Sequence, residues 1–300
     1  MVKHGYPVSM AVSIQASSAE LGVIIPPSVP LILFAVSTQT SITQLFIAGL
    51  GPGLLVAGSL IVMVQIWCRV KGYGKEDGAD RRAVLPSLRN AFWALMMPVI
   101  ILGGIYGGIF TPTEAAAVAV VYALVLGLFV YREMTLSDLP DLFRRAAISS
   151  GAVMLIISAA SLFSFLISLS GMPNTVGAWA QATFDHGWSF LLAINILLFF
   201  VGMFIETSAA ILVLAPILTP IAISYGIDPV HFGVVIVVNL ALGMFTPPLG
   251  VNLFAAASVA EIPVQRMFSS LVIPVVTVVT ALMMITYLPV ISLGLRDLMM

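Results

Sequence analysis

Long apolar stretches, separated by short polar segments, run through most of this 300-residue chain. A helix needs about 20 apolar residues to cross a hydrocarbon core of about 30 Å, and several stretches meet that length. They predict membrane spans at residues 8–36, 45–67, 92–110, 112–131, 147–170, 230–258 and 264–290. The pattern therefore predicts an all-α integral membrane protein.

The stretch 188–224 has a different pattern. It is long enough to cross twice, but Gly202, Glu206, Thr207 and Ser208 interrupt its middle. Polar backbone at membrane depth is tolerated where protein or a cavity surrounds it. We therefore predict a re-entrant hairpin, in which two half-helices enter and leave by one face and meet at a tip over residues 202–208.

Two other spans are interrupted near their centres by adjacent prolines, Pro26-Pro27 and Pro247-Pro248. A proline inside a helix removes a hydrogen bond and costs about 3 kcal/mol or more. The freed carbonyl groups must be buried in protein or line a cavity. We predict two broken helices around a polar site, where carbonyl oxygens suit a monovalent cation and half-helix N-termini suit an anionic substrate. A simple proline kink is the alternative for either span alone.

The two proline pairs belong to an internal repeat. Residues 4–27 align without a gap with residues 225–248, an offset of 221, and the repeat also matches Ser37 with Ser258. The predicted layout places an odd number of crossings between the copies, so the two broken helices run in opposite directions. This is the inverted repeat found in many secondary transporters.

Charge supports this layout and gives it an orientation. The composition is 60% hydrophobic and only 8% charged, far from that of a soluble protein. With alternating spans, Arg296 falls on one side and eleven basic residues fall on the other, namely Lys3, Arg69, Lys71, Lys75, Arg81, Arg82, Arg89, Arg132, Arg144, Arg145 and Arg266. The positive-inside rule makes loops 69–91 and 131–146 cytoplasmic, so the hairpin opens outward.

Small and polar residues around the breaks and the tip are the candidate substrate and ion ligands. They are Ser17, Ser18, Gly22, Pro26, Pro27 and Ser28 at the first break, Gly202, Glu206, Thr207 and Ser208 at the tip, and Asn239, Gly243, Thr246, Pro247, Pro248 and Asn252 at the second break. We assign the predicted monovalent cation to Thr207, Gly243 and Thr246. The alternative is that these hydroxyls bond their own backbone, as Ser and Thr in membrane helices often do.

Three carboxylates fall at or near membrane depth, Glu20, Glu114 and Glu206, and each is a functional candidate because buried charge is costly in lipid. Helix capping is at least as good an interpretation for Glu114, which follows Thr111. The histidines, His4, His186 and His231, lie near span ends without metal-ligand spacing and are interpreted as interfacial.

Motifs of the common enzyme classes are missing from the sequence. It contains no P-loop, no His-Glu-x2-His and no Gly-x-Ser-x-Gly. We therefore predict a protein that is not an enzyme, carries no organic cofactor and draws its energy from an ion gradient or a partner.

Four runs resemble the large membrane subunit of TRAP transporters, the DctM type. Residues 16–28 read ASSAELGVIIPPS, 107–117 read GGIFTPTEAAA, 202–207 read GMFIET and 239–252 read NLALGMFTPPLGVN. The likeness covers essentially the whole chain. It implies sodium-coupled uptake of organic acids, of C4-dicarboxylate or sugar-acid type, across the bacterial inner membrane by an elevator motion. It also implies two partners, a periplasmic solute-binding protein and a small DctQ-type membrane subunit.

The resemblance also implies a domain layout. Residues 1–68 would be the remainder of the first repeat, 69–91 a cytoplasmic loop, and 92–300 the second repeat, with scaffold helices at 92–170. Family members carry further helices and a first hairpin upstream of Gly5-Tyr6, so we interpret the chain as N-terminally truncated, with an incomplete first ion site. A stand-alone anion/sodium symporter of related architecture and a non-transporting membrane scaffold are the alternatives.

Overall fold

The computed structural model describes residues 1–2, 5–73 and 84–300. Lys3, His4, Lys75, Arg81 and Arg82 lie outside the described residues. Within the described ranges the chain forms helices and connecting loops without a strand. It divides into two units, one formed by Met1–Lys75 with Ala160–Met300 and the other by Glu76–Ala159.

Many of these helices are long enough to span a membrane. Six of the described helices are long and apolar enough to cross a membrane, and there are seven such spans if the bent pair Val8–Ile24 and Val29–Thr38 counts as one. The predicted all-α integral membrane fold is therefore confirmed.

The first broken helix consists of α1 (Val8–Ser18), α2 (Leu21–Ile24) and α3 (Val29–Thr38), with a bend of 42° at the break. Pro26-Pro27 separates α2 from α3. Ser28 starts α3, because its hydroxyl accepts a hydrogen bond from Leu31 N at 3.4 Å while donating to the carbonyl of Val23. The long helix α4 (Ile42–Lys71) follows.

The second broken helix repeats this plan. It consists of α11 (Pro229–Gly243) and α12 (Val251–Val259), followed by the short η5 (Val264–Met267) and by α13 (Phe268–Tyr287). The starts at 8 and 229 differ by 221, as do the ends at 38 and 259. Both Pro-Pro peptide bonds are cis. Helix boundaries thus follow the offset found in the sequence.

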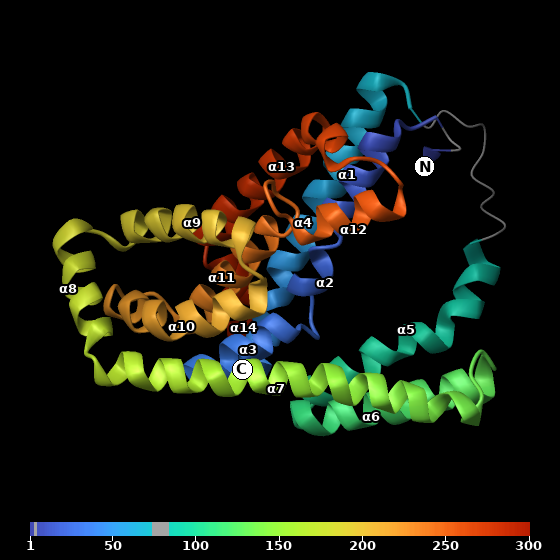
Figure 1. Cartoon of the computed structure of the whole chain (residues 1–300), viewed down its shortest axis with the longest axis horizontal. Coiled ribbons are helices and arrows are strands. Elements are labelled where there is room, and N and C mark those ends of the chain that lie inside the picture. The colour runs from blue at the N-terminus through green and yellow to red at the C-terminus, as the bar shows by residue number, and fades with distance from the viewer. Residues whose placement is uncertain (3–4, 74–83) are drawn as a thin grey trace. The chain divides into compact units, whose positions relative to one another are not determined.

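The two broken helices run antiparallel. The start of the first, α1, packs against α12, the end of the second, while α3 packs against α11 (Figure 1). The aromatic ring of Phe34 on α3 lies against Gly233 on α11, where a Cβ atom would come within 2.4 Å of the ring. The repeat is therefore inverted in space, as the predicted crossings require.

Hydrogen bonds place three helix ends at one end of this unit. The Cys68 thiol near the end of α4 lies 3.5 Å from the Tyr6 hydroxyl, and Ser270 at the start of α13 lies 3.2 Å from Ser9 at the start of α1. Arg69 and Lys71 on α4 therefore lie at the same end as the short η5 helix before α13, as the charge pattern predicts.

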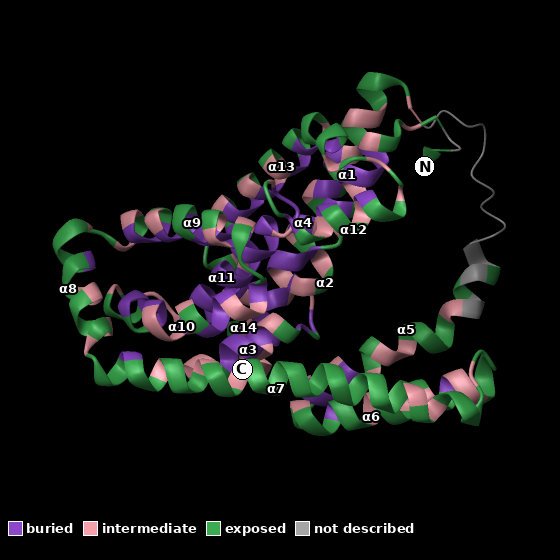
Figure 2. Ribbon diagram, viewed as in Figure 1, coloured by how far each residue is buried: buried purple, intermediate pink, exposed green. Residues whose placement is uncertain are grey.

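The predicted hairpin is formed by α9 (Gly187–Phe204) and α10 (Thr207–Ser224), joined by two residues. Its outer ends both lie near α8 (Met172–Thr183), because Gln181 bonds Ser224 at 3.1 Å and Tyr225 bonds the Phe184 carbonyl at 3.0 Å. The two arms have 18 residues each and together cover residues 187–224, close to the predicted range 188–224. Helix α11, buried along its whole length, packs against α9 and α10 (Figure 2).

The second unit contains α5 (Val84–Tyr106), α6 (Pro112–Val125) and η3 (Leu126–Val130), then η4 (Leu136–Asp138) and the first part of α7 (Leu139–Leu169). Thr111 and Glu114 form a capping box at the start of α6, with the Thr111 N–H donating to the Glu114 carboxylate at 2.8 Å. For Glu114 the structure thus shows the capping contact that the sequence left as one of two interpretations.

The C-terminal helix α14 (Val290–Met299) contacts the start of α11. Arg296 pairs with Asp228 at 2.8 Å, and Ser292 lies 2.7 Å from the ring of His231. His231 is only 2% exposed and also contacts the Thr286 carbonyl at 3.2 Å. His231 is therefore buried in the protein near the start of α11, close to a span end as the sequence places it, and its location at the membrane interface stays a prediction. Its two hydrogen-bonding neighbours explain how an imidazole is accommodated in the core.

Candidate functional site

The hairpin tip and the second break meet through two glycines. A Cβ atom on Gly243 would lie 2.3 Å from the carbonyl carbon of Gly202, and one on Gly202 would lie 3.1 Å from the Leu240 carbonyl oxygen. Since real Cβ atoms do not approach backbone this closely, only glycine allows the contact. The structure thus brings the predicted residues of the tip and of the second break together.

At the tip, the carboxylate of Glu206 acts as the N-cap of α10. It accepts hydrogen bonds from the Ala209 N–H at 3.0 Å and from the Ser208 hydroxyl at 2.9 Å. Capping of this kind satisfies a free helix N–H and complements the positive end of the helix dipole. The carboxylate and Ser208 are therefore engaged with each other in this structure.

Thr207, next to Glu206, differs from it in burial and in hydrogen bonding. Its side chain is 1% exposed, and its hydroxyl oxygen has no hydrogen-bond partner among the described residues. A buried polar atom normally finds a partner, and one left without costs about 1–3 kcal/mol. This oxygen is available to a ligand.

On α11, one turn before Gly243, Asn239 is fully buried. Its amide nitrogen donates to the side-chain oxygen of Asn195 at 2.8 Å and to the Asn195 carbonyl at 2.9 Å, while its own oxygen is unpartnered among the residues described. Asn195 in turn donates to Thr286 at 3.1 Å. Helices α9, α11 and α13 thus hold the Asn239 oxygen in a fixed position.

The remaining predicted residues of the second break are partly engaged. Thr246 donates its hydroxyl hydrogen to the Leu242 carbonyl at 2.7 Å, leaving only lone pairs for a ligand. The backbone N–H of Asn252 donates to the Met244 carbonyl at 2.9 Å, and its buried amide nitrogen is unpartnered within the described part of the chain. Helix α12 starts without a side-chain cap, and the N–H groups of Asn252 and Leu253 in its first turn donate to the backbone carbonyls of Met244 and Gly250.

The first break packs against α4. Cβ atoms on Gly49 and Gly53 would lie 3.1 Å from the Ile24 carbonyl and 2.5 Å from the Ile25 side chain. Ser17 and Ser18 both donate to the Ile14 carbonyl, at 3.1 and 2.7 Å. Gly22 and Pro27 are exposed, while Pro26 and Ser28 are buried. For these serines the structure shows the backbone bonding that was the alternative to ion binding.

Glu20, in the turn between α1 and α2, is fully buried, and neither carboxylate oxygen has a partner among the described residues. A charged carboxylate is strongly disfavoured in such surroundings. Within the described ranges, Glu20 therefore has no hydrogen-bond donor that would stabilise a negative charge.

Sequence reasoning missed Asn195, Gly49 and Gly53. Asn195 is a lone amide in an otherwise apolar helix, and this signal would have marked it as a buried polar partner. The run Gly49-Leu50-Gly51-Pro52-Gly53 would have marked a helix face that packs closely against another segment.

Comparison with known proteins adds a family. Residues 1–291 match the family model described as "Tripartite ATP-independent periplasmic transporter, DctM component". The chain is 42% identical over 297 residues to a C4-dicarboxylate TRAP transporter large permease protein DctM of Pseudomonas aeruginosa, covering 99% of this chain and 70% of the relative. It is 42% identical over 296 residues to an isethionate TRAP transporter permease protein DctMQ of Oleidesulfovibrio alaskensis (98% and 46%). Similarity to a sialic acid TRAP transporter large permease protein SiaM of Vibrio cholerae is 38% over 293 residues (98% and 69%).

Proposed function

Because the chain belongs to the DctM component family of tripartite ATP-independent periplasmic transporters, we propose that it couples the import of organic acids to the entry of sodium ions. The family consists of transporter permeases and not of enzymes, and the chain is a multi-pass protein of the bacterial inner membrane. The class of substrate and the identity of the coupling ion are the two parts of this proposal that go beyond family membership.

The contact between the hairpin tip and the second break is the observation that carries sodium coupling. It places the orphan hydroxyl oxygen of Thr207 on the tip that packs against α11, which also carries the orphan oxygen of Asn239. Hydroxyl, amide and freed carbonyl oxygens are ligands that a hard monovalent cation accepts. Thr207, Gly243 and Thr246 would hold the ion, and Asn239 fits the same role.

The uncapped N-terminus of α12 supports an anionic substrate. The positive end of its dipole favours a carboxylate. A sodium ion held beside the break would add positive charge to the same region. An organic acid is therefore the solute that this arrangement favours.

Similar permeases are named for different substrates, which supports the proposal that another subunit selects the solute. The C4-dicarboxylate and isethionate permeases are equally identical to this chain, at 42%. The percentage of identical residues therefore does not indicate which of these solutes the chain transports. We propose that a periplasmic binding protein selects the solute and that a small DctQ-type subunit accompanies the permease. The fusion named DctMQ supports the second partner.

Sodium binding is testable before the solute is known. A ligand that binds only the folded state at 100 times its Kd stabilises that state by about 2.7 kcal/mol. We expect sodium chloride, but not choline chloride at equal concentration, to raise the unfolding temperature of the detergent-purified protein. Equal unfolding temperatures in the two salts would refute sodium binding.

Replacing Thr207 by Val removes the orphan oxygen but keeps the shape of the side chain. We expect the sodium concentration that gives half of the thermal shift to rise at least tenfold, because a ligand oxygen is lost. Thr219→Val is the matched control, since Thr219 is also buried on α10, and its hydroxyl has no hydrogen-bond partner in the described part of the protein, but it lies three turns from the tip. Equal effects of the two substitutions would assign the shift to general stability.

Transport itself is measured in proteoliposomes that contain the permease with its small subunit, with the binding protein added outside. We expect uptake of a labelled C4-dicarboxylate or sugar acid to require an inward sodium gradient. Uptake without sodium would overturn the proposed coupling. Uptake without the binding protein would favour a stand-alone symporter.

A further inference from the structure

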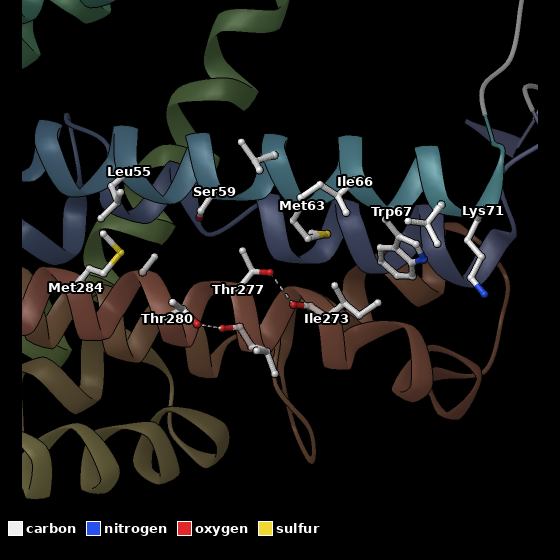
Figure 3. A pocket seen from close by; sticks show the side chains of 14 residues that line it. Leu55, Ser59, Met63, Ile66, Trp67, Lys71, Ile273, Thr277, Thr280 and Met284 are labelled. Carbon is white, nitrogen blue, oxygen red and sulfur yellow. Dashed lines mark hydrogen bonds between the residues drawn. The ribbon is translucent and has the colours of Figure 1, made fainter.

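A long groove separates α4 from α13 within the larger unit. It has a volume of about 590 Å³ and runs from Leu55 and Met284 at one end to Trp67 and Lys71 at the other (Figure 3). Its walls are built mainly from aliphatic side chains of the two helices, among them Val62, Ile66 and Val276. Helices α4 and α13 occupy equivalent places in the two repeats, so the groove runs along their junction.

Polar groups in the groove are already engaged. The hydroxyl of Ser59 donates to the Val56 carbonyl at 2.8 Å, that of Thr277 to Ile273 at 2.9 Å and that of Thr280 to Val276 at 2.8 Å. Each of these bonds lies within the helix that carries the hydroxyl. These three hydroxyls have no hydrogen left to donate, so the groove offers hydrocarbon except at the end formed by Trp67 and Lys71.

One end of the groove differs from the rest. Lys71 lies in the last turn of α4, and no acidic side chain pairs with it among the residues that the structure describes. Trp67 lies one turn before it, and Trp is typical of the membrane interface, where Lys side chains also extend their charge toward water. The opposite end, at Leu55 and Met284, carries no charge. The groove is thus apolar with a single cationic end.

The length of the groove matches one half of a bilayer. Sixteen residues separate Leu55 from Lys71, which corresponds to about 24 Å along a helix. A bilayer measures about 40–45 Å including its headgroups, so one leaflet accounts for about 20–22 Å. A phospholipid with its headgroup at the Lys71 end would therefore cover most of the groove.

We propose that an anionic phospholipid of the leaflet on the Lys71 side binds in this groove. Its acyl chain lies between α4 and α13, and its phosphate pairs with the Lys71 ammonium beside Trp67. The charge at the Lys71 end fixes the orientation of the lipid, and the engaged hydroxyls keep the groove selective for hydrocarbon. Binding at this site is independent of sodium and of the transported solute.

Native mass spectrometry of the protein in nonionic detergent tests this site with phosphatidylglycerol and phosphatidylcholine added as the anionic and the zwitterionic lipid. We expect one retained phosphatidylglycerol molecule. Thr280→Trp fills the groove and should lower its retention at least tenfold, while Val272→Trp, an exposed residue of α13 outside the groove, should not. Equal retention by the two Trp variants would overturn the site.

The headgroup contact is tested separately at exposed residues that leave the core intact. Lys71→Gln should lower the preference for phosphatidylglycerol over phosphatidylcholine at least threefold, while Arg69→Gln, two residues away and outside the groove, should retain it. Equal preferences in the two Gln variants would overturn the role of Lys71. Loss of the lipid on addition of the small membrane subunit would show that a protein helix covers the groove instead.

Discussion

At the scale of single residues, the site depends on the absence of a side chain at Gly243. This residue and Gly202 bring the end of α9, which leads into the hairpin tip, into backbone contact with the end of α11. A methyl group at Gly243 would meet the Gly202 backbone at 2.3–2.5 Å, which neither segment can absorb by moving a flexible side chain. The hairpin tip would have to move away from α11.

We therefore predict that Gly243→Ala lowers the free energy of unfolding by about 1–3 kcal/mol, the usual cost of overpacking. It should also abolish the sodium-dependent shift in unfolding temperature. Gly22, the equivalent residue of the first repeat, is the control, because a Cβ atom there meets nothing within 4 Å. Gly22→Ala should leave the stability equal or slightly raised. A similar loss in both variants would contradict the role assigned to the glycine contact.

The positions of the helix breaks were predictable from sequence, because they depend on the backbone properties of glycine and proline. The Gly and Pro-Pro signals at both breaks gave the broken helices, because prolines interrupt a helix whatever surrounds them. The environments of Glu206 and Thr207 were not predictable. These neighbours differ in burial because α10 starts between them, so one side chain caps the helix while the other turns into the core.

At the scale of elements, the start of α11 is fixed by Asp228. Its carboxylate accepts hydrogen bonds from Val230 N at 2.8 Å and His231 N at 3.3 Å, and it pairs with Arg296 on α14. Burial by itself would raise the pKa of Asp228, but the hydrogen bond from Arg296, the two N–H groups and the guanidinium charge together lower it below the ordinary value. The ionised form is thus favoured in the folded protein.

Substitutions at Asp228 should have graded effects. Asp228→Asn keeps an N-cap oxygen and loses the ion pair, so we expect a loss of about 0.5–1 kcal/mol. Asp228→Ala loses both, at about 1–3 kcal/mol. Thermal unfolding in nonionic detergent measures the series. Equal losses for Asn and Ala would show that the ion pair, and not the cap, carries the whole effect.

The same contact has a defined pH dependence. Because the pKa is lowered in the folded state, the stabilisation is complete above the ordinary Asp value of 3.8 and is lost as the pH falls through the lower folded value. The difference between the wild type and Asp228→Asn should therefore stay constant from pH 7 to pH 5 and shrink below about pH 3.8. A difference that already disappears at pH 6 would assign the effect to another group.

Hydrophobic periodicity predicted the elements well, because span length is set by the bilayer. Boundaries were less predictable: α4 continues to Lys71 and α5 begins at Val84, inside the range expected to be a loop. Polar residues extend a helix beyond the hydrocarbon region without changing the apolar pattern. The capping box at Thr111 and Glu114 was readable because it is local in sequence.

At the scale of the whole molecule, both broken helices and the hairpin belong to one unit. We propose that this unit moves as one body during transport, in the elevator manner that the resemblance implies. The motion then changes no distance within the unit. Ser9 and Ser270, whose hydroxyl oxygens lie 3.2 Å apart, provide a place to test this.

We predict that a disulfide in the double variant Ser9→Cys, Ser270→Cys leaves sodium-dependent uptake within about twofold of the reduced protein. Cys68→Ser supplies the background, because Cys68 is the only native cysteine. Mass spectrometry of the oxidised protein confirms the cross-link, and each single Cys variant is the control for oxidation. Uptake that stops on cross-linking and returns on reduction would show that α1 and α13 move relative to each other.

The equal spacing of the two broken helices bears on how this protein has diverged and how it can be engineered. Many aligned side chains differ between the two copies: Glu20 aligns with Ala241, and Ser28 aligns with Leu249. The copies nevertheless have the same length from helix start to helix end. One inserted residue would rotate every later side chain of a helix by about 100°. The two copies therefore differ by substitution and not by insertion, and tags or reporter residues inserted between Val8 and Thr38, or between Pro229 and Val259, would break a register that both copies share.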